Sequence, residues 1–294
     1  MINLENNYYE QMLKGNYEVA LAEMHADNAF IFARDEEGNT LLHYATFDGN
    51  IEIAKWLLSH GACPISYNLC GVSPVNSCVQ GKNLELFKIL LHKARFSLTE
   101  SDKGIIFASA VSQGEISFIE HLLSIGYDSN MVFNSDPIII WAIQSKSVEC
   151  VRLLCDNGAD VNAQNDYGMT ALYSAAADGV YEIVKYLILK GAEVDKTSDN
   201  HVTPLMIASQ CNHPEVIKIL LESGADIENR NKDGGTALLD AIRSGCVDAL
   251  NILIQSGADI DAVDKRGNGK AHNVRKIRNK KTRGAVEELL GMTR

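Results

Sequence analysis

The chain has 294 residues, with 27 Lys and Arg against 38 Asp and Glu, which gives a formal net charge of −11. Its hydrophobic fraction of 46% is too high for an intrinsically disordered chain. No apolar run approaches the length of a membrane span, so we expect no contact with a membrane.

The beginning of the chain and its cysteines predict a cytoplasmic location. The first residues lack the basic stretch followed by an apolar stretch that marks a secretory signal. Seven cysteines stand at irregular spacing in a chain too long to need disulfides for stability. We therefore expect reduced thiols in the cytosol.

A sequence pattern recurs about every 33 residues. The pattern of residues 35–45 is matched at 165–175, 198–208 and 231–241. Such a fixed period is typical of repeat architectures, in which each repeat is one supersecondary unit. The threonine position of the pattern falls in turn at Thr40, Ser73, Ile105, Pro137, Thr170, Thr203 and Thr236.

One repeat predicts a pair of helices followed by a hairpin. The threonine at its start supplies the N-cap oxygen of a short helix. After a Gly turn, apolar residues at helical spacing in 51–58 predict a second helix with one buried face. Gly61 ends that helix in the left-handed conformation, which glycine adopts most readily. One helix pair cannot bury its apolar face alone, so neighbouring pairs must stack into a solenoid.

These features resemble the ankyrin-repeat family. The resemblance rests on the period, on the pattern that begins at Thr40 and its equivalents, and on the Gly-Ala-Asp-Val-Asn segment at 158–162, with variants at 191–195, 224–228 and 257–261. It implies an all-α repeat protein, an ankyrin-repeat solenoid of stacked antiparallel helix pairs with projecting hairpin loops and little regular β structure.

The repeats divide the chain into three parts. Residues 1–33 are predicted to be an N-terminal capping repeat that lacks a hairpin, and residues 267–294 a divergent, basic C-terminal capping repeat. Residues 34–266 hold seven ankyrin-like repeats, at about 34–66, 67–99, 100–131, 132–163, 164–196, 197–229 and 230–262, followed by a further hairpin tip.

The repeats at 100–163 are degenerate. The unit at about 101–131 loses the hairpin signature, and the next has Pro137 at the threonine position. We expect irregular hairpins in both. Because hairpin and capping signals fail there, residues 101–140 are predicted to be the least stable stretch of the chain.

The sequence indicates no catalytic residues, no metal site and no cofactor. Gly267 to Lys270 lacks the full spacing of a phosphate-binding loop. Cys150 and Cys155 are five residues apart on one predicted helix and are interpreted as small buried hydrophobic residues rather than metal ligands. His43 stands where the resemblance implies a structural histidine that ties the helix start to the adjacent hairpin. We expect the protein not to be an enzyme.

The resemblance implies that a partner protein binds in the concave groove, on hairpin tips and exposed positions of the first helices. Several of these positions carry large apolar side chains, of the kind that dominate interface energetics. Two alternatives stay open: Trp141 could instead fill the core beside Ile139 and Ile140, and a shift of a repeat could bury Tyr167. The predicted partner-binding residues are Asn39, Tyr44, Phe47, Asp48, Trp141, Asp166, Tyr167, Met169, Ile207, Lys232, Asp233, Asp240 and Arg243.

A basic tract at 265–283 contrasts with the rest of the chain. It holds nine bases and no acid, so the remainder carries a net charge of −20. A solvated polar cap, a nuclear-localisation signal, and a site for an acidic or phosphate-bearing partner are its three interpretations. The bases are Lys265, Arg266, Lys270, Arg275, Lys276, Arg278, Lys280, Lys281 and Arg283.

These observations predict a non-enzymatic protein–protein interaction module that is monomeric by itself. The acidic body favours a partner with a basic or mixed surface and argues against nucleic acid in the groove. Two biological roles fit: a bacterial effector delivered to the cytosol or nucleus of a host, as decoy or scaffold, and an inhibitor or immunity protein. The alternative function is binding of nucleic acid or an acidic partner through the basic cap.

Overall fold

The computed structural model describes residues 31–292, which divide into two compact units at 31–127 and 128–292. The N-terminal capping repeat expected at 1–33 therefore lies almost wholly outside the described residues. Within the described part, no helix is long and apolar enough to cross a membrane.

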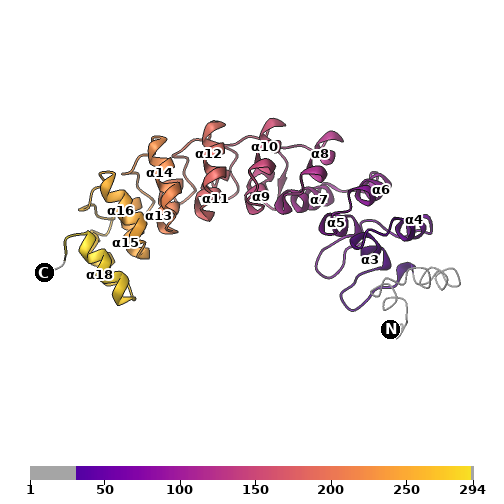
Figure 1. Cartoon of the computed structure of the whole chain (residues 1–294), viewed down its shortest axis with the longest axis horizontal. Helices are drawn as coiled ribbons and strands as arrows, with labels where there is room; N and C mark the ends of the chain where they lie inside the picture. The colour runs from indigo at the N-terminus through magenta and orange to yellow at the C-terminus, as the bar shows by residue number, and fades with distance from the viewer. Residues whose placement is uncertain (1–30, 293–294) are drawn as a thin grey trace. The chain divides into compact units, whose positions relative to one another are not determined.

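The unit at 31–127, unit 1, consists of three helix pairs in its described part. The two helices of each pair contact each other, and the first helices α3, α5 and α7 contact in sequence (Figure 1). The helices are α3 (Leu41–Phe47), α4 (Ile51–Ser59), α5 (Pro74–Gln80), α6 (Leu84–Ala94), α7 (Glu100–Gln113) and α8 (Ile116–Ser124).

The unit at 128–292, unit 2, continues the same pattern. Its first helices α9, α11, α13 and α15 form one row, and its second helices α10, α12, α14 and α16 form another (Figure 1). The helices are α9 (Ile138–Gln144), α10 (Val148–Asp156), α11 (Ala171–Asp178), α12 (Tyr181–Leu189), α13 (Pro204–Gln210), α14 (Pro214–Glu222), α15 (Ala237–Ser244), α16 (Val247–Gln255), α17 (Lys270–Arg275) and α18 (Lys280–Leu289).

Four first helices, α5, α11, α13 and α15, begin at the caps that the sequence predicted. The hydroxyl oxygens of Ser73, Thr170, Thr203 and Thr236 accept hydrogen bonds from the backbone N–H three residues on. Each bond satisfies a donor that the first turn of a helix leaves free. Behind these caps, alanines keep the helices close to their neighbours, and Ala175 is fully buried.

The second helices end at glycines in the left-handed region, also as predicted. Gly61, Gly158, Gly191 and Gly257 have φ between 88° and 97°. In each case the residue after the glycine donates its N–H to a carbonyl in the last turn of the helix, as Ala62 does to Leu57 at 3.0 Å.

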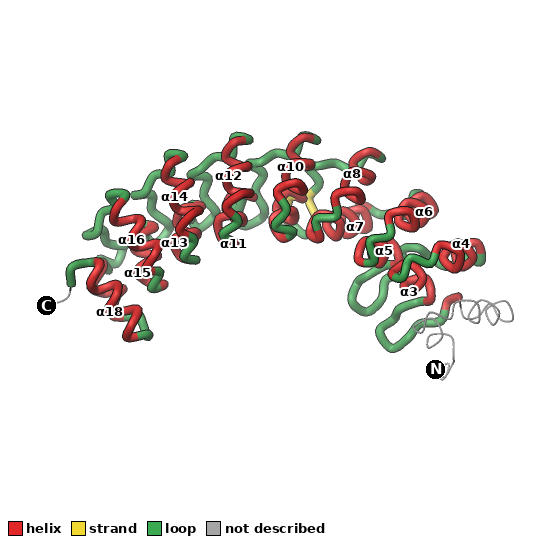
Figure 2. The backbone as a smooth tube through the Cα atoms, viewed as in Figure 1, coloured by secondary structure: helices red, strands yellow, loops and turns green. Residues whose placement is uncertain are grey.

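The degenerate repeats depart from the pattern in two ways. Between α6 and α7 the projecting hairpin is replaced by the short connection 95–99. The next hairpin is a strand pair, β1 (Val132–Phe133) with β2 (Asp136–Pro137), across a tight turn in which Asn134 and Ser135 both have positive φ (Figure 2). That geometry is typical of the type I′ turn, so this hairpin differs from the others by being more regular.

The expectation that helix capping fails in the degenerate stretch is wrong for α7. The Thr99 hydroxyl oxygen accepts the backbone N–H of Asp102 at 3.1 Å, and the Asp102 carboxylate accepts the N–H of Thr99 at 2.7 Å. This reciprocal pair is a capping box. Its sequence signal, an acidic residue three positions after a threonine, begins just before the stretch 101–140 and ends inside it.

Candidate binding surface

The hairpin tips of neighbouring repeats are joined by backbone hydrogen bonds. In unit 1 the N–H of Leu69 donates to the carbonyl of Glu37 at 2.9 Å. In unit 2 the N–H of Asp199 donates to Tyr167 at 2.9 Å, and that of Lys232 to Asn200 at 3.0 Å. These bonds hold successive tips in register. We call the tips and the neighbouring half-buried or exposed positions of the first helices the hairpin face of each unit.

Each tip is also shaped by one polar side chain at its base. The Asn165 Oδ1 atom accepts the backbone N–H groups of Tyr167 and Met169 at 3.0 and 2.9 Å. Asp35 does the same for the N–H groups of Glu37 and Asn39. Because the turn itself satisfies these polar groups, the side chains at the tip remain available to face outward.

The hairpin face of unit 1 carries Asn39, Tyr44, Phe47 and Asp48. Phe47 is 52% exposed, whereas Tyr44 is half-buried and its hydroxyl donates to Oδ2 of Asp35 at 2.5 Å. Burial, reinforced by this hydrogen bond, raises the pKa of Tyr44 to about 12. Tyr44 is thus fixed against its own hairpin. Asn39 is half-buried, and its Oδ1 accepts from Nδ2 of Asn68 at 2.7 Å.

Trp141, in unit 2, neither fills the core nor faces solvent freely. It is half-buried, its indole N–H donates to the Phe133 carbonyl at 3.2 Å, and its ring lies 5.7 Å from the Phe133 ring. The strand pair β1–β2 therefore supports one side of the indole. The neighbouring side chains Ile139 and Ile140 are the ones that are buried.

The remaining apolar candidates in unit 2 differ in exposure. Tyr167 projects from its tip and is 67% exposed, so the alternative in which it is buried is wrong. Met169 and Ile207 are half-buried, so they offer less surface to a partner than Tyr167 does. Asp166 is exposed beside Tyr167.

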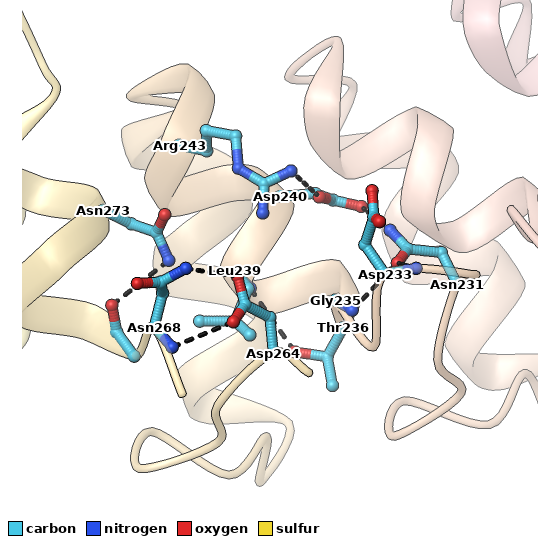
Figure 3. A network of polar contacts seen from close by, with 11 residues as sticks. Asn231, Asp233, Gly235, Thr236, Leu239, Asp240, Arg243, Asp264, Asn268 and Asn273 are labelled. Carbon is cyan, nitrogen blue, oxygen red and sulfur yellow. Dashed lines mark hydrogen bonds and ion pairs between the residues drawn. The ribbon is translucent and has the colours of Figure 1, made fainter. Parts of the chain in front are cut away.

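Asp240 corrects the sequence prediction most clearly, because it is only 7% exposed. The hairpin that carries Asn231 lies against the start of α15 (Figure 3), and Nδ2 of Asn231 contacts the Asp240 carboxylate at 3.4 Å. Nη1 of Arg243 donates to the carboxylate at 3.2 Å. Burial raises the pKa of Asp240 to about 6, and the attraction of Arg243 lowers it only in part. Lys232 and Asp233 stay exposed at the tip of the same hairpin.

Sequence reasoning missed one apolar residue at a hairpin tip. Leu69 is 80% exposed on unit 1. Its signal was available, because Asn68 and Gly71 align with Asn165 and Gly168 and place Leu69 at the tip.

The basic tract is exposed over most of its length but is not wholly solvated. Arg283 donates through Nε and Nη2 to the Ile277 carbonyl, at 3.0 and 2.7 Å. Lys270 pairs with Asp261 at 2.8 Å. The other seven bases, Lys265, Arg266, Arg275, Lys276, Arg278, Lys280 and Lys281, are exposed.

The described residues offer no metal centre. Among residues 31–292, no three His, Cys, Asp or Glu side chains gather as metal ligands. None of the seven cysteines, all of which are described residues, forms a disulfide, and Cys150 is buried. His43 has the predicted structural role: Nδ1 accepts the N–H of Thr40 at 2.9 Å and Nε2 donates to the Val72 carbonyl, in the next hairpin, at 3.1 Å. Burial lowers the pKa of His43 and favours this neutral form.

The comparison with known families decides the identity of these repeats. A family profile described as "Ankyrin repeats (3 copies)" matches residues 11–102, 107–198 and 175–264. The chain belongs to the ankyrin-repeat family. The ankyrin repeats explain the helix pairs and hairpins, and such repeats generally mediate protein–protein interaction.

Curated relatives share parts of this ankyrin-repeat array. The chain is 28% identical over 148 residues to the human transient receptor potential cation channel subfamily A member 1, and this match covers 50% of the chain and 10% of the channel. It is 27% identical over 170 residues to an L-asparaginase of Dirofilaria immitis, a match that covers 56% of the chain and 28% of that protein. It is 29% identical over 152 residues to the mouse B-cell lymphoma 3 protein homolog, a match that covers 49% of the chain and 34% of that protein. The chain thus spans about a third or less of the length of these relatives.

Proposed function

We propose that the chain is a non-enzymatic module that binds a partner protein through its hairpin faces and the adjoining groove. The observation that carries the proposal is the combination, at the tips, of fixed backbone and exposed apolar side chains. The tips of Glu37 and Leu69 are joined by a backbone hydrogen bond, as are those of Tyr167 and Asp199, yet Leu69 and Tyr167 stand in solvent.

Fixed tips favour affinity for a physical reason. Binding costs free energy when flexible loops and side chains are ordered, and a surface that is already ordered avoids most of that cost. Tyr167 adds a large amphipathic side chain with few rotatable bonds, the type of residue that often dominates interface energetics. Exposed Lys232 and Asp233 offer polar contacts at another tip.

The charge of the chain supports a partner with a basic or mixed surface. Outside 265–283 the net charge is −20, which attracts basic surfaces and speeds their association. No cofactor is part of the proposal, and the chain acts as a monomer before it meets its partner.

The test is affinity capture from native lysate followed by crosslinking mass spectrometry. Lysines stand on both sides of unit 2, with Lys232 at a tip and Lys185 and Lys218 on second helices. We expect crosslinks to the captured protein from Lys232. Crosslinks confined to Lys185 and Lys218 would contradict the proposed surface.

Two biological roles satisfy this proposal. An inhibitor or immunity protein that masks a basic toxin or enzyme is favoured by the acidic body. A bacterial effector working in the cytosol or nucleus of a host is favoured by the eukaryote-like repeats and the basic tract. The gene neighbourhood separates them, since a toxin gene beside this one supports the first and a secretion-system locus the second.

The basic tract supports a second function, binding of nucleic acid or an acidic partner through the C-terminal cap. Nine bases without an acid between residues 265 and 283 are the observation that favours it. Phosphate contacts release counterions, so affinity for a nucleic acid must fall as salt rises. Titration of a DNA duplex at two salt concentrations tests this function. An affinity that is undetectable or independent of salt would exclude nucleic acid as a ligand of the basic tract.

A further inference from the structure

Unit 1 contains a pocket away from its hairpin face, between the second helices α6 and α8 and the first turn of α7. Its volume is about 490 Å³. That size falls in the range of small-molecule sites rather than of extended protein interfaces. The residues that line it are Lys88, Leu91, His92, Arg95, Leu98, Lys103, His121, Ile125 and Tyr127.

The degenerate repeat explains why the pocket exists. Where other repeats send out a hairpin after the second helix, α6 is followed by the short connection 95–99. The helices α6 and α8 contact through the rings of Phe87 and Phe118, whose centroids are 4.9 Å apart. Leu91, Leu98 and Ile125 then give the pocket an aliphatic lining.

The charged side chains that line the pocket are all basic. Five of the nine lining residues are basic types and none is acidic. Lys88, His92 and Arg95 are spaced so that they share the face of α6 that lies on the pocket. In a chain with a net charge of −11, this concentration of bases runs against the overall composition.

No carboxylate lines the pocket, although burial and then the charges of nearby Glu100 and Asp102 raise the pKa of Tyr127. Lys103 pairs with Glu100 at 2.7 Å, but Glu100 is 82% exposed and does not line the pocket. Among the described residues, Lys88 and Arg95 have no carboxylate partner, whereas the second-helix bases Arg152 and Lys190 of unit 2 each have one.

A bound anion would supply a hydrogen-bond acceptor to the Tyr127 hydroxyl and a negative charge near His121 and Lys88. The Tyr127 hydroxyl is buried and has no hydrogen-bond partner among the described residues. Burial, followed by the charge of Lys88, lowers the pKa of His121. A bound anion would accept from the hydroxyl and offset the positive potential of the lysine.

We infer that this pocket binds a small amphiphilic organic anion, an aliphatic or aromatic body that carries one acidic group such as a carboxylate. The apolar body fills the space between Leu91, Leu98 and Ile125. The acidic group lies among Lys88, Arg95 and the Tyr127 hydroxyl. This inference does not depend on the partner protein proposed above.

A pair of fluorescent probes tests the inference on the full chain. Anilinonaphthalene sulfonate has an apolar aromatic body and one negatively charged sulfonate group. Phenylnaphthylamine is the same molecule without the sulfonate group and is uncharged. We expect the sulfonate to bind about tenfold more tightly than the amine, since charge-assisted hydrogen bonds are the stronger kind. Decanoate should displace the sulfonate, and decanol should not.

Variants at the pocket rim locate the binding. The double substitution Lys88→Met with Arg95→Met should weaken sulfonate binding about tenfold or more. The matched control is Lys93→Met, on the same helix but outside the pocket, which should leave the affinity unchanged. All three side chains are exposed, and circular dichroism checks that the variants fold.

Substitution of Tyr127 distinguishes a binding role from a structural one, because it should change the affinity for the sulfonate but not the stability of the free protein. Tyr127→Phe should weaken sulfonate binding about threefold without lowering the stability of the free protein, because the hydroxyl it removes has no partner there. No binding of the sulfonate to the wild-type chain, equal affinity for sulfonate and amine, or equal affinity in the double variant would each overturn the inference.

Discussion

The side chain of Asn162 connects one ankyrin repeat to the next through the backbone of Glu193. Its Oδ1 accepts the Glu193 N–H at 2.8 Å, and its Nδ2 donates to the carbonyl of Gly191 at 3.1 Å. Asn130 makes the same two contacts one repeat earlier, with Asp160 and Gly158. In both places one asparagine thus links two neighbouring repeats, near the end of the second helix of the later repeat.

Replacing Asn162 should therefore destabilise unit 2. Asn162→Ala removes two hydrogen bonds at a half-buried position, and we expect a loss of about 1–2 kcal/mol in the free energy of unfolding. Urea titration followed by circular dichroism measures it. Asp166→Ala, at an exposed tip residue whose side chain makes no hydrogen bond to a described residue, is the control and should change the free energy little.

The close approach of Gly81 to α3 gives a second prediction. A Cβ atom at Gly81 would lie 2.0 Å from the carbonyl oxygen of Phe47, although its φ of −80° suits any residue. Gly81→Ala must therefore push α3 and α5 apart, and we expect a loss of about 1–3 kcal/mol, as for other overpacked sites.

Gly284 provides the matched control for that substitution. It lies in α18, where a Cβ would meet nothing within 4 Å. Gly284→Ala should stabilise the chain by about 0.5–1 kcal/mol, because alanine loses less conformational entropy in a helix. Thermal unfolding measures both variants, and equal effects of the two substitutions would rule out the steric explanation for Gly81.

The buried carboxylate of Asp240 predicts a pH dependence of stability. Its pKa is raised from 3.8 to about 6 in the folded protein, so the folded state binds more protons than the unfolded state between these pH values. Its contribution to stability is therefore full below about pH 4 and is lost as the pH rises to about 6. By linkage, about 3 kcal/mol of stability is the upper bound of this loss.

The variant Asp240→Asn isolates that contribution from those of other carboxylates. The difference in unfolding free energy between variant and wild type should move in favour of the variant as the pH rises from 4 to 6, and stay constant above. Asp166→Asn should show no such trend. A difference that is flat from pH 4 to 7 would mean that Asp240 is not desolvated.

Much of this architecture follows from the sequence because the determinants are local. Thr170 caps its helix through an oxygen three residues from its donor, and Gly61 ends its helix through its own backbone conformation. Asp240 could not be predicted, since its burial depends on Asn231 reaching across from another element. The pocket beside Lys88 also escaped, because it results from a hairpin that is missing rather than from a motif.

The stretch at 101–140 remains predicted to be the first to open. The connection 95–99 just before it has no projecting hairpin, and the asparagine contacts of the kind that Asn130 and Asn162 make with the backbone of the next repeat begin only at Asn130. Stability in a solenoid is largely a sum over neighbouring repeats, so a poor interface opens locally. Hydrogen exchange should show faster amide exchange there than at 171–222, and the reverse order would contradict the prediction.

The most direct test of the central claim is the affinity for the captured partner protein, measured by titration calorimetry with two single variants of unit 2. Tyr167 and Leu189 are both large, apolar and exposed, at 67% and 80%, but Tyr167 lies at a hairpin tip and Leu189 on the second helix α12. We predict that Tyr167→Ala weakens binding by about tenfold or more, while Leu189→Ala leaves it within about twofold. Loss of affinity in Leu189→Ala with full affinity in Tyr167→Ala would contradict the account.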